Sequence, residues 1–176
     1  MMMKIKFTSL LIFFFSILAY PSFACDYRII NFGTNLKSVK LEPPPITFPD
    51  AFGGTTMAIP LETICPNEVH LLGSTLNLLF VNDQMISIKL ERANQNDKKL
   101  MDLAMKQFGK FPIPNNVEKK DWRGVYTWDK ANEFISYFSF NIPQGEVEII
   151  RIENKKYIDQ FIEYEKKIEE WISSQK

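Results

Sequence analysis

The chain of 176 residues is 45% hydrophobic and 24% charged, and its 21 basic side chains balance its 21 acidic ones. This balance argues against a general nucleic-acid-binding protein and against a protein that binds anionic membranes, because both classes carry a basic excess on one face. The chain has one histidine. A metal site built on several histidines and a pair of histidines acting as acid and base are therefore excluded.

Residues 1–24 have the composition of a secretory signal peptide. The basic start MMMKIK precedes the apolar run FTSLLIFFFSILAY, and Ser22 and Ala24 stand at the −3 and −1 positions of a cut before Cys25. The run is shorter than the roughly 20 residues that span a bilayer, so we expect a cleaved signal rather than an uncleaved anchor. Cleavage removes two lysines and no acid, which leaves 19 basic and 21 acidic side chains. We expect residues 25–176 to form a single exported domain, periplasmic or secreted, with no integral membrane segment.

The chain has two cysteines, Cys25 and Cys65. Because exported proteins meet an oxidising compartment, we expect a Cys25–Cys65 disulfide, which would close a loop of about 40 residues and stabilise the fold by roughly 4 kcal/mol. The alternative is a lipoprotein anchored through acylated Cys25. Ser22 and Phe23 fit a lipoprotein signal poorly, and acylation would leave Cys65 unpaired.

Residues 27–32 are a short strand candidate, and residues 40–66 follow as a long irregular segment. Six prolines and the pair Gly53-Gly54 disfavour a helix or a central strand there. The segment is too apolar for a disordered linker, so we interpret it as an ordered loop strapped over the core and braced by the disulfide. Gly53-Gly54 is not followed by a helix, which argues against a phosphate-binding loop.

Residues 76–92, LNLLFVNDQMISIKLER, have the pattern of a β-hairpin and are the expected nucleus of a sheet. A three-residue loop would pair Val81 with Met85, whereas a two-residue loop would scatter the apolar side chains over both faces. We therefore expect a loop of three or five residues. The side chains that this register places on one face are Leu76, Leu78, Phe80, Ile86, Ile88 and Leu90.

Residues 97–108 are predicted to form a helix that begins with Asn96 and Asp97 as its cap and ends before Gly109. Its methionines, Met101 and Met105, are interpreted as core residues rather than as an adaptable binding stripe.

Three strands are predicted next, at residues 122–128, 133–142 and 146–152, in meander order. The middle strand is apolar on both faces, which indicates a central position with helices covering one face. The aromatic residues of these strands are interpreted mostly as core residues, although such residues also form binding hot spots. They are Trp122, Tyr126, Trp128 and Tyr137.

Residues 155–173 form the most regular amphipathic pattern, with an apolar stripe that steps by four and three residues. The stripe consists of Tyr157, Phe161, Tyr164, Ile168 and Trp171. It is too short to indicate a coiled coil, and docking on the protein's own sheet is favoured over a role as a partner helix. The predicted fold is α+β: an antiparallel sheet made of the hairpin 76–92 and the meander 122–152, with both amphipathic helices packed on one face.

Few catalytic arrangements fit the sequence. A serine hydrolase would need His70 beside a hydroxyl such as that of Ser74, and the motif Gly-x-Ser-x-Gly does not occur. The cysteines are assigned to the disulfide, which leaves no free thiol as a nucleophile. Glu146 and Glu148, on one strand face, match a glycosidase-like pair, but exposed acids on a polar strand face are the ordinary interpretation.

We therefore expect an exported protein-binding module that is not an enzyme and needs no cofactor, for example an inhibitor or immunity protein of the cell envelope. The expected contact with the partner protein is drawn from residues 46–60, with Pro49, Phe52 and Met57 as contact residues. One alternative is a carrier of a small apolar ligand or lipid, and another is a carboxylate-dependent hydrolase. A deep apolar cavity would favour the carrier, and a solid core would favour the binding module.

Overall fold

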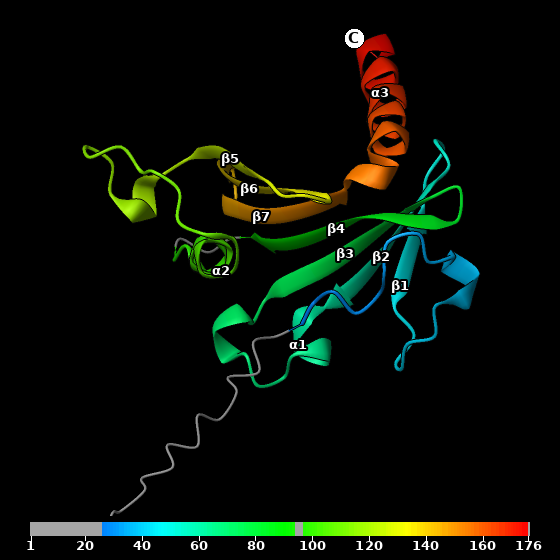
Figure 1. Cartoon of the computed structure of the whole chain (residues 1–176), viewed down its shortest axis with the longest axis horizontal. Helices are drawn as coiled ribbons and strands as arrows, with labels where there is room; N and C mark the ends of the chain where they lie inside the picture. Colours follow the sequence, from blue (N-terminus) through cyan, green and yellow to red (C-terminus); the bar gives the residue numbers. More distant parts are fainter. Residues whose placement is uncertain (1–25, 94–96, 176) are drawn as a thin grey trace, which may run out of the picture.

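The computed structural model describes residues 26–93 and 97–175. Seven strands form one antiparallel sheet in the order β1-β2-β3-β4-β7-β6-β5 (Figure 1). The strands are β1 (Ile46–Pro49), β2 (Gly54–Pro60), β3 (Ser74–Val81), β4 (Gln84–Ala93), β5 (Gly124–Asp129), β6 (Glu133–Ile142) and β7 (Gly145–Asn154). The helices are α1 (Leu61–Ile64), α2 (Lys99–Phe108) and α3 (Ile158–Ser174). The predicted α+β class and the antiparallel sheet are confirmed.

The sheet consists of two meanders that are joined along one pair of strands. β1 to β4 are sequential neighbours, as are β5 to β7, and β4 pairs with β7 between them. α2 lies on the connection from β4 to β5 (Figure 1). The predicted meander is therefore one half of the sheet, and the predicted hairpin is the β3–β4 part of the other half, which β1 and β2 complete.

The hairpin of β3 and β4 has a two-residue turn, so the expected loop of three or five residues is wrong. Val81 pairs with Gln84, and both turn residues, Asn82 and Asp83, have positive φ angles of 50° and 65°, as a type I′ turn requires. The register then shifts next to Ile86, because Phe80 pairs with Met85 and Leu79 with Ser87. This bulge keeps most apolar side chains of the hairpin on one face, which is the effect that a loop of odd length was expected to have.

The bulge leaves five of the six expected side chains on one face and turns Ile86 to the other. Leu76, Leu78, Phe80, Ile88 and Leu90 are in the main core. Ile86 belongs instead to a second cluster with Val81, Phe161 and Tyr164.

The two long helices lie on opposite faces of the sheet, so the prediction that both pack on one face is wrong. α2 contributes Leu100 and Met101 to the main core. α3 contributes Phe161 to the second cluster, and its ring lies 5.1 Å from the guanidinium of Arg151, whose strand neighbour Ile150 points into the main core. The sequence shows that each helix has an apolar stripe, but not which face of the sheet buries that stripe. Ile86, which the bulge turns to the second face, packs there with the stripe of α3.

The expectation that residues 40–66 form a loop strapped over the core is wrong. The segment extends the sheet by β1 and β2 and continues into α1. The prolines are accommodated because Pro49 ends an edge strand and Pro60 lies beyond the end of β1. Gly53, with φ of 87°, supplies the turn between the two strands.

The N-terminal expectations have mixed outcomes. Residues 27–32 form no strand, although Gly33 donates to the carbonyl of Met85 at 2.8 Å and ties the segment to β4. Cys65 follows α1, whereas Cys25 and the expected signal peptide, residues 1–24, lie outside the described residues. The described structure therefore does not support the disulfide brace, and the Cys25–Cys65 bond stays a prediction.

The remaining boundaries agree closely with the prediction at residues 133–142 and within a few residues elsewhere. In α2 the cap position is taken by Lys98, whose backbone is left-handed and whose side chain makes no capping hydrogen bond. Asp97 is thus not the cap, and Asn96 lies outside the described residues. Among the helices of the described residues, none is long and apolar enough to cross a membrane.

Candidate functional site

The face of the sheet opposite α2 is covered by α3 at one end only (Figure 1). On the uncovered part, Val125, Phe138 and Ile149 lie directly opposite one another on β5, β6 and β7, and Phe140 pairs with Val147 in the next row. Val125 is 59% exposed and Phe140 is 43% exposed, whereas Phe138 and Ile149 are half-buried and Val147 is buried. We call these five residues the open face. Apolar residues gathered in this way on a solvent-facing surface commonly mark an interaction site.

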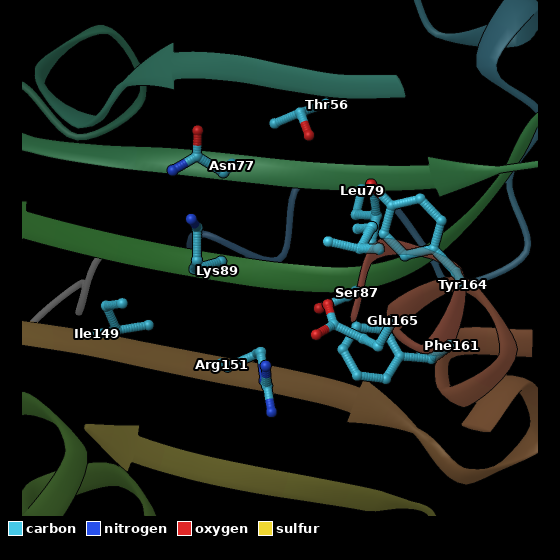
Figure 2. A pocket seen from close by; sticks show the side chains of 11 residues that line it. Thr56, Asn77, Leu79, Ser87, Lys89, Ile149, Arg151, Phe161, Tyr164 and Glu165 are labelled. Carbon is cyan, nitrogen blue, oxygen red and sulfur yellow. The ribbon is translucent and has the colours of Figure 1, made fainter. Parts of the chain in front are cut away.

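A cleft of about 310 Å³ lies beside α3 and shares Ile149 with the open face (Figure 2). Its floor comes from β2, β3, β4 and β7, and its wall comes from α3. The lining residues are Thr56, Asn77, Leu79, Ser87, Lys89, Ile149, Arg151, Phe161, Tyr164, Glu165 and Ile168.

Arg151 occupies a central place in the cleft. Its guanidinium carbon lies 4.9 Å from the ring centre of Phe138 and 5.1 Å from that of Phe161, so two rings flank the charge. Its Nε lies 2.8 Å from Glu153, a carboxyl whose pKa is raised by burial against the opposing effect of Arg151. The guanidinium is therefore held in a defined position.

A second polar cluster is buried on the other face, beside α2. The ammonium group of Lys98, which is 1% exposed, donates to the carbonyl of Trp122 at 2.7 Å, to Ser139 Oγ at 2.6 Å and to Glu146. Burial lowers the pKa of Lys98, although the hydrogen bond and the charge of Glu146 oppose this change. All three ammonium protons are thus used within the protein.

Glu148, on the same strand, caps α2. Its carboxylate accepts hydrogen bonds from the amides of Leu100 and Met101, at 3.3 and 2.9 Å, and from the hydroxyl of Tyr137 at 2.7 Å. Burial raises the pKa of Glu148 in spite of these hydrogen bonds. Glu146 and Glu148 are 4% and 1% exposed, so the interpretation as exposed acids is wrong. Their contacts assign them to holding Lys98 and α2.

The three expected contact residues do not share a surface. Pro49 is exposed on edge strand β1, and Phe52, in the β1–β2 turn, packs 6.0 Å from Trp171 of α3. Met57 is 4% exposed and lies in the main core, on the other face of the sheet from Phe52. His70 is exposed beside Glu68.

The aromatic residues of the meander serve the main core. Phe111 stacks on Tyr126 at 4.7 Å, and it also contacts Trp122, Trp128 and Tyr137. Sequence reasoning missed the open face, although its signal was present: the apolar residues on both faces of residues 133–142 were interpreted only as the mark of a central strand with helices covering one face.

Among the described residues, no group of three histidines, cysteines or acids is arranged to hold a metal ion. No protein-family model matches the chain, and neither a curated protein nor a solved structure shows significant similarity to it.

Proposed function

We propose that this is an exported protein-binding module of the cell envelope, of the inhibitor or immunity type, that acts without catalysis and takes its partner on the open face. The observation that supports the proposal is the apolar row Val125–Phe138–Ile149, which continues to the exposed Phe140 and which no helix of the described residues covers. Binding a partner there would remove apolar area from water at about 25 cal/mol per Å². The rigid strands beneath the row reduce the entropy lost on binding.

The partner that fits the open face presents apolar side chains to the strand surface formed by β5, β6 and β7. Phe138 is the natural anchor, because the guanidinium of Arg151 lies over its ring and holds it in place. Anchors of this kind carry most of the binding free energy in protein interfaces.

The experiment compares two exposed valines on different sides of the protein. Tagged residues 25–176 are used to capture partners from a periplasmic extract, with Val125→Asp on the open face and Val69→Asp as the matched control; the two valines are 59% and 67% exposed. We expect Val125→Asp to abolish capture and Val69→Asp to retain it. Equal capture by both variants would refute the open face as the docking surface. Phe52→Ala tests the 46–60 segment in the same assay.

The second candidate, a carrier of a small apolar ligand, is favoured by the cleft, whose volume of about 310 Å³ lies at the lower end of the range for ligand pockets. An apolar fluorescent probe tests it. Saturable binding that Leu79→Asp in the cleft abolishes, and that Val125→Asp leaves intact, would support the carrier over the protein-binding module.

A further inference from the structure

Two basic side chains lie directly opposite each other on the floor of the cleft. Lys89 of β4 pairs in register with Arg151 of β7, and Figure 2 shows both on neighbouring strands. The same row continues with Asn77 on β3 and Ser136 on β6. Like charges at directly opposed positions destabilise a sheet. The row thus places positive charge and hydrogen-bonding groups at one point beside the open face.

The intramolecular partners of these cations leave them able to bind. Lys89 pairs with Glu91 at 2.9 Å, with side chains 39% and 34% exposed, and ion pairs with this exposure contribute little. Arg151 is engaged through Nε by Glu153, which is almost fully buried. Within the described part of the chain, its two terminal nitrogens form no hydrogen bond. A guanidinium fixed between two rings, with both terminal nitrogens unused, is preorganised for an external acceptor.

We propose that Lys89 and Arg151 bind a carboxylate of the partner protein, an acidic side chain that lies next to the apolar residues on the open face. This inference rests on the proposed function and names the chemistry of its partner. The charged side chains that line the cleft are Lys89, Arg151 and Glu165, and the ion-pair partners Glu91 and Glu153 lie beside the two cations. The planar fork of the arginine matches the two oxygens of a carboxylate.

The position of the cations relative to the apolar row defines the recognised motif. Arg151 and Ile149 are two residues apart on β7 and point to the same face, and Ile149 also lines the cleft. A partner segment that covers Phe138 and Ile149 therefore brings its neighbouring side chain over Arg151. The surface is therefore expected to bind a segment in which an acidic side chain stands next to an apolar one.

The test uses two capped tripeptides, phenylalanine-glutamate-phenylalanine and phenylalanine-glutamine-phenylalanine, titrated into isotope-labelled residues 25–176 and followed by NMR. We expect the glutamate peptide to bind about tenfold more tightly, a preference that high salt reduces. Arg151→Gln removes the preference, and Arg151→Lys retains part of it. Arg28→Gln is the matched control, because Arg28 also pairs with a glutamate but lies outside the cleft; this variant keeps the preference.

Several results would overturn the inference. They are equal binding of the two peptides, no binding of either, a preference that persists in Arg151→Gln, and displacement of the glutamate peptide by an equal concentration of inorganic phosphate. Lys89→Gln weakens the preference independently, so the test stands if Arg151→Gln does not fold. If Val125→Asp abolishes partner capture while the peptide preference is absent, the open face stands and the carboxylate site fails. If Val125→Asp leaves capture unchanged while the peptide preference is present, the carboxylate site stands and the open face fails as the docking surface.

Discussion

The carboxylate of Glu148 accepts a hydrogen bond from the amide of Met101 at 2.9 Å, across 47 residues of sequence. The first amides of a helix have no partner within the helix, and α2 has no side-chain cap of its own, since Lys98 at the cap position makes no such bond. A strand residue thus supplies the cap that a local Ser, Thr, Asp or Asn usually supplies. The start of α2 is fixed to β7 rather than to the preceding loop.

Glu148→Ala is expected to destabilise the protein by about 3 kcal/mol or more, because it leaves the Leu100 and Met101 amides and the Tyr137 hydroxyl without an acceptor in a buried place. Urea unfolding measures the loss, with exposed Glu163→Ala as the control. Tyr137→Phe should lower the free energy of unfolding by less in the Glu148→Ala background than in the natural protein. Equal costs in both backgrounds would show that the hydroxyl and the carboxylate are not coupled.

The unfolding free energy is expected to rise as the pH falls from about 7 toward 4.5, the ordinary pKa of a glutamate. The folded-state pKa values of Glu148 and Glu153 are raised by burial, so the folded protein holds more protons than the unfolded chain within this window. Below pH 3.8 the trend reverses, because hydrogen bonds hold the pKa of Asp50 and Asp97 below that value against the effect of burial. Denaturant unfolding over this pH range checks the profile, and Glu148→Gln should flatten its upper part. A stability that falls steadily from pH 7 downward contradicts the prediction.

Removing Glu146 from the buried pair with Lys98 is expected to cost about 3 to 5 kcal/mol, because the buried ammonium group loses its counterion. Removing Lys98 should cost less, because Arg123 Nη2 lies 3.2 Å from Glu146 and still balances its charge. Lys98→Met and Glu146→Leu are the single variants, and the double variant should recover most of the loss. Thermal and urea unfolding of the four proteins measure the coupling. Costs that simply add in the double variant would mean that the pair does not act as a unit.

The elements with strong periodicity could be predicted from the sequence, and their packing partners could not. β6 and the two long helices follow patterns within one segment, whereas the choice of face for α3 depends on where the bulge turns Ile86. β1 and β2 were missed because proline and glycine content argued against strands, although Pro49 and Pro60 occupy the positions that tolerate proline. The cap from Glu148 joins residues that no local pattern connects. The choice of Met57 as a contact residue has the same origin: in the sequence it resembles an apolar loop residue, but it points into the core from an inner strand.

Mature protein from a periplasmic extract is expected to begin at Cys25 and to weigh two hydrogens less than its reduced form, as the predicted Cys25–Cys65 disulfide requires. Intact-mass measurement before and after reduction checks both points. A diacylglycerol-modified N-terminus would instead indicate a lipoprotein anchored in the membrane.

The pairing of β4 with β7 has a consequence for folding kinetics. Within the meanders, adjacent strands are joined by short turns or, between β2 and β3, by residues 61–73. The pairing of Leu90 with Ile150 instead closes a longer loop that contains α2, β5 and β6. Such non-local closure is the slow part of folding. We therefore expect Ile150→Val at this seam to slow refolding, and Met57→Leu in β2 to act mainly on the unfolding rate; stopped-flow rates against denaturant separate the two. The two halves would then behave as preformed units, and their meeting would be the transition state.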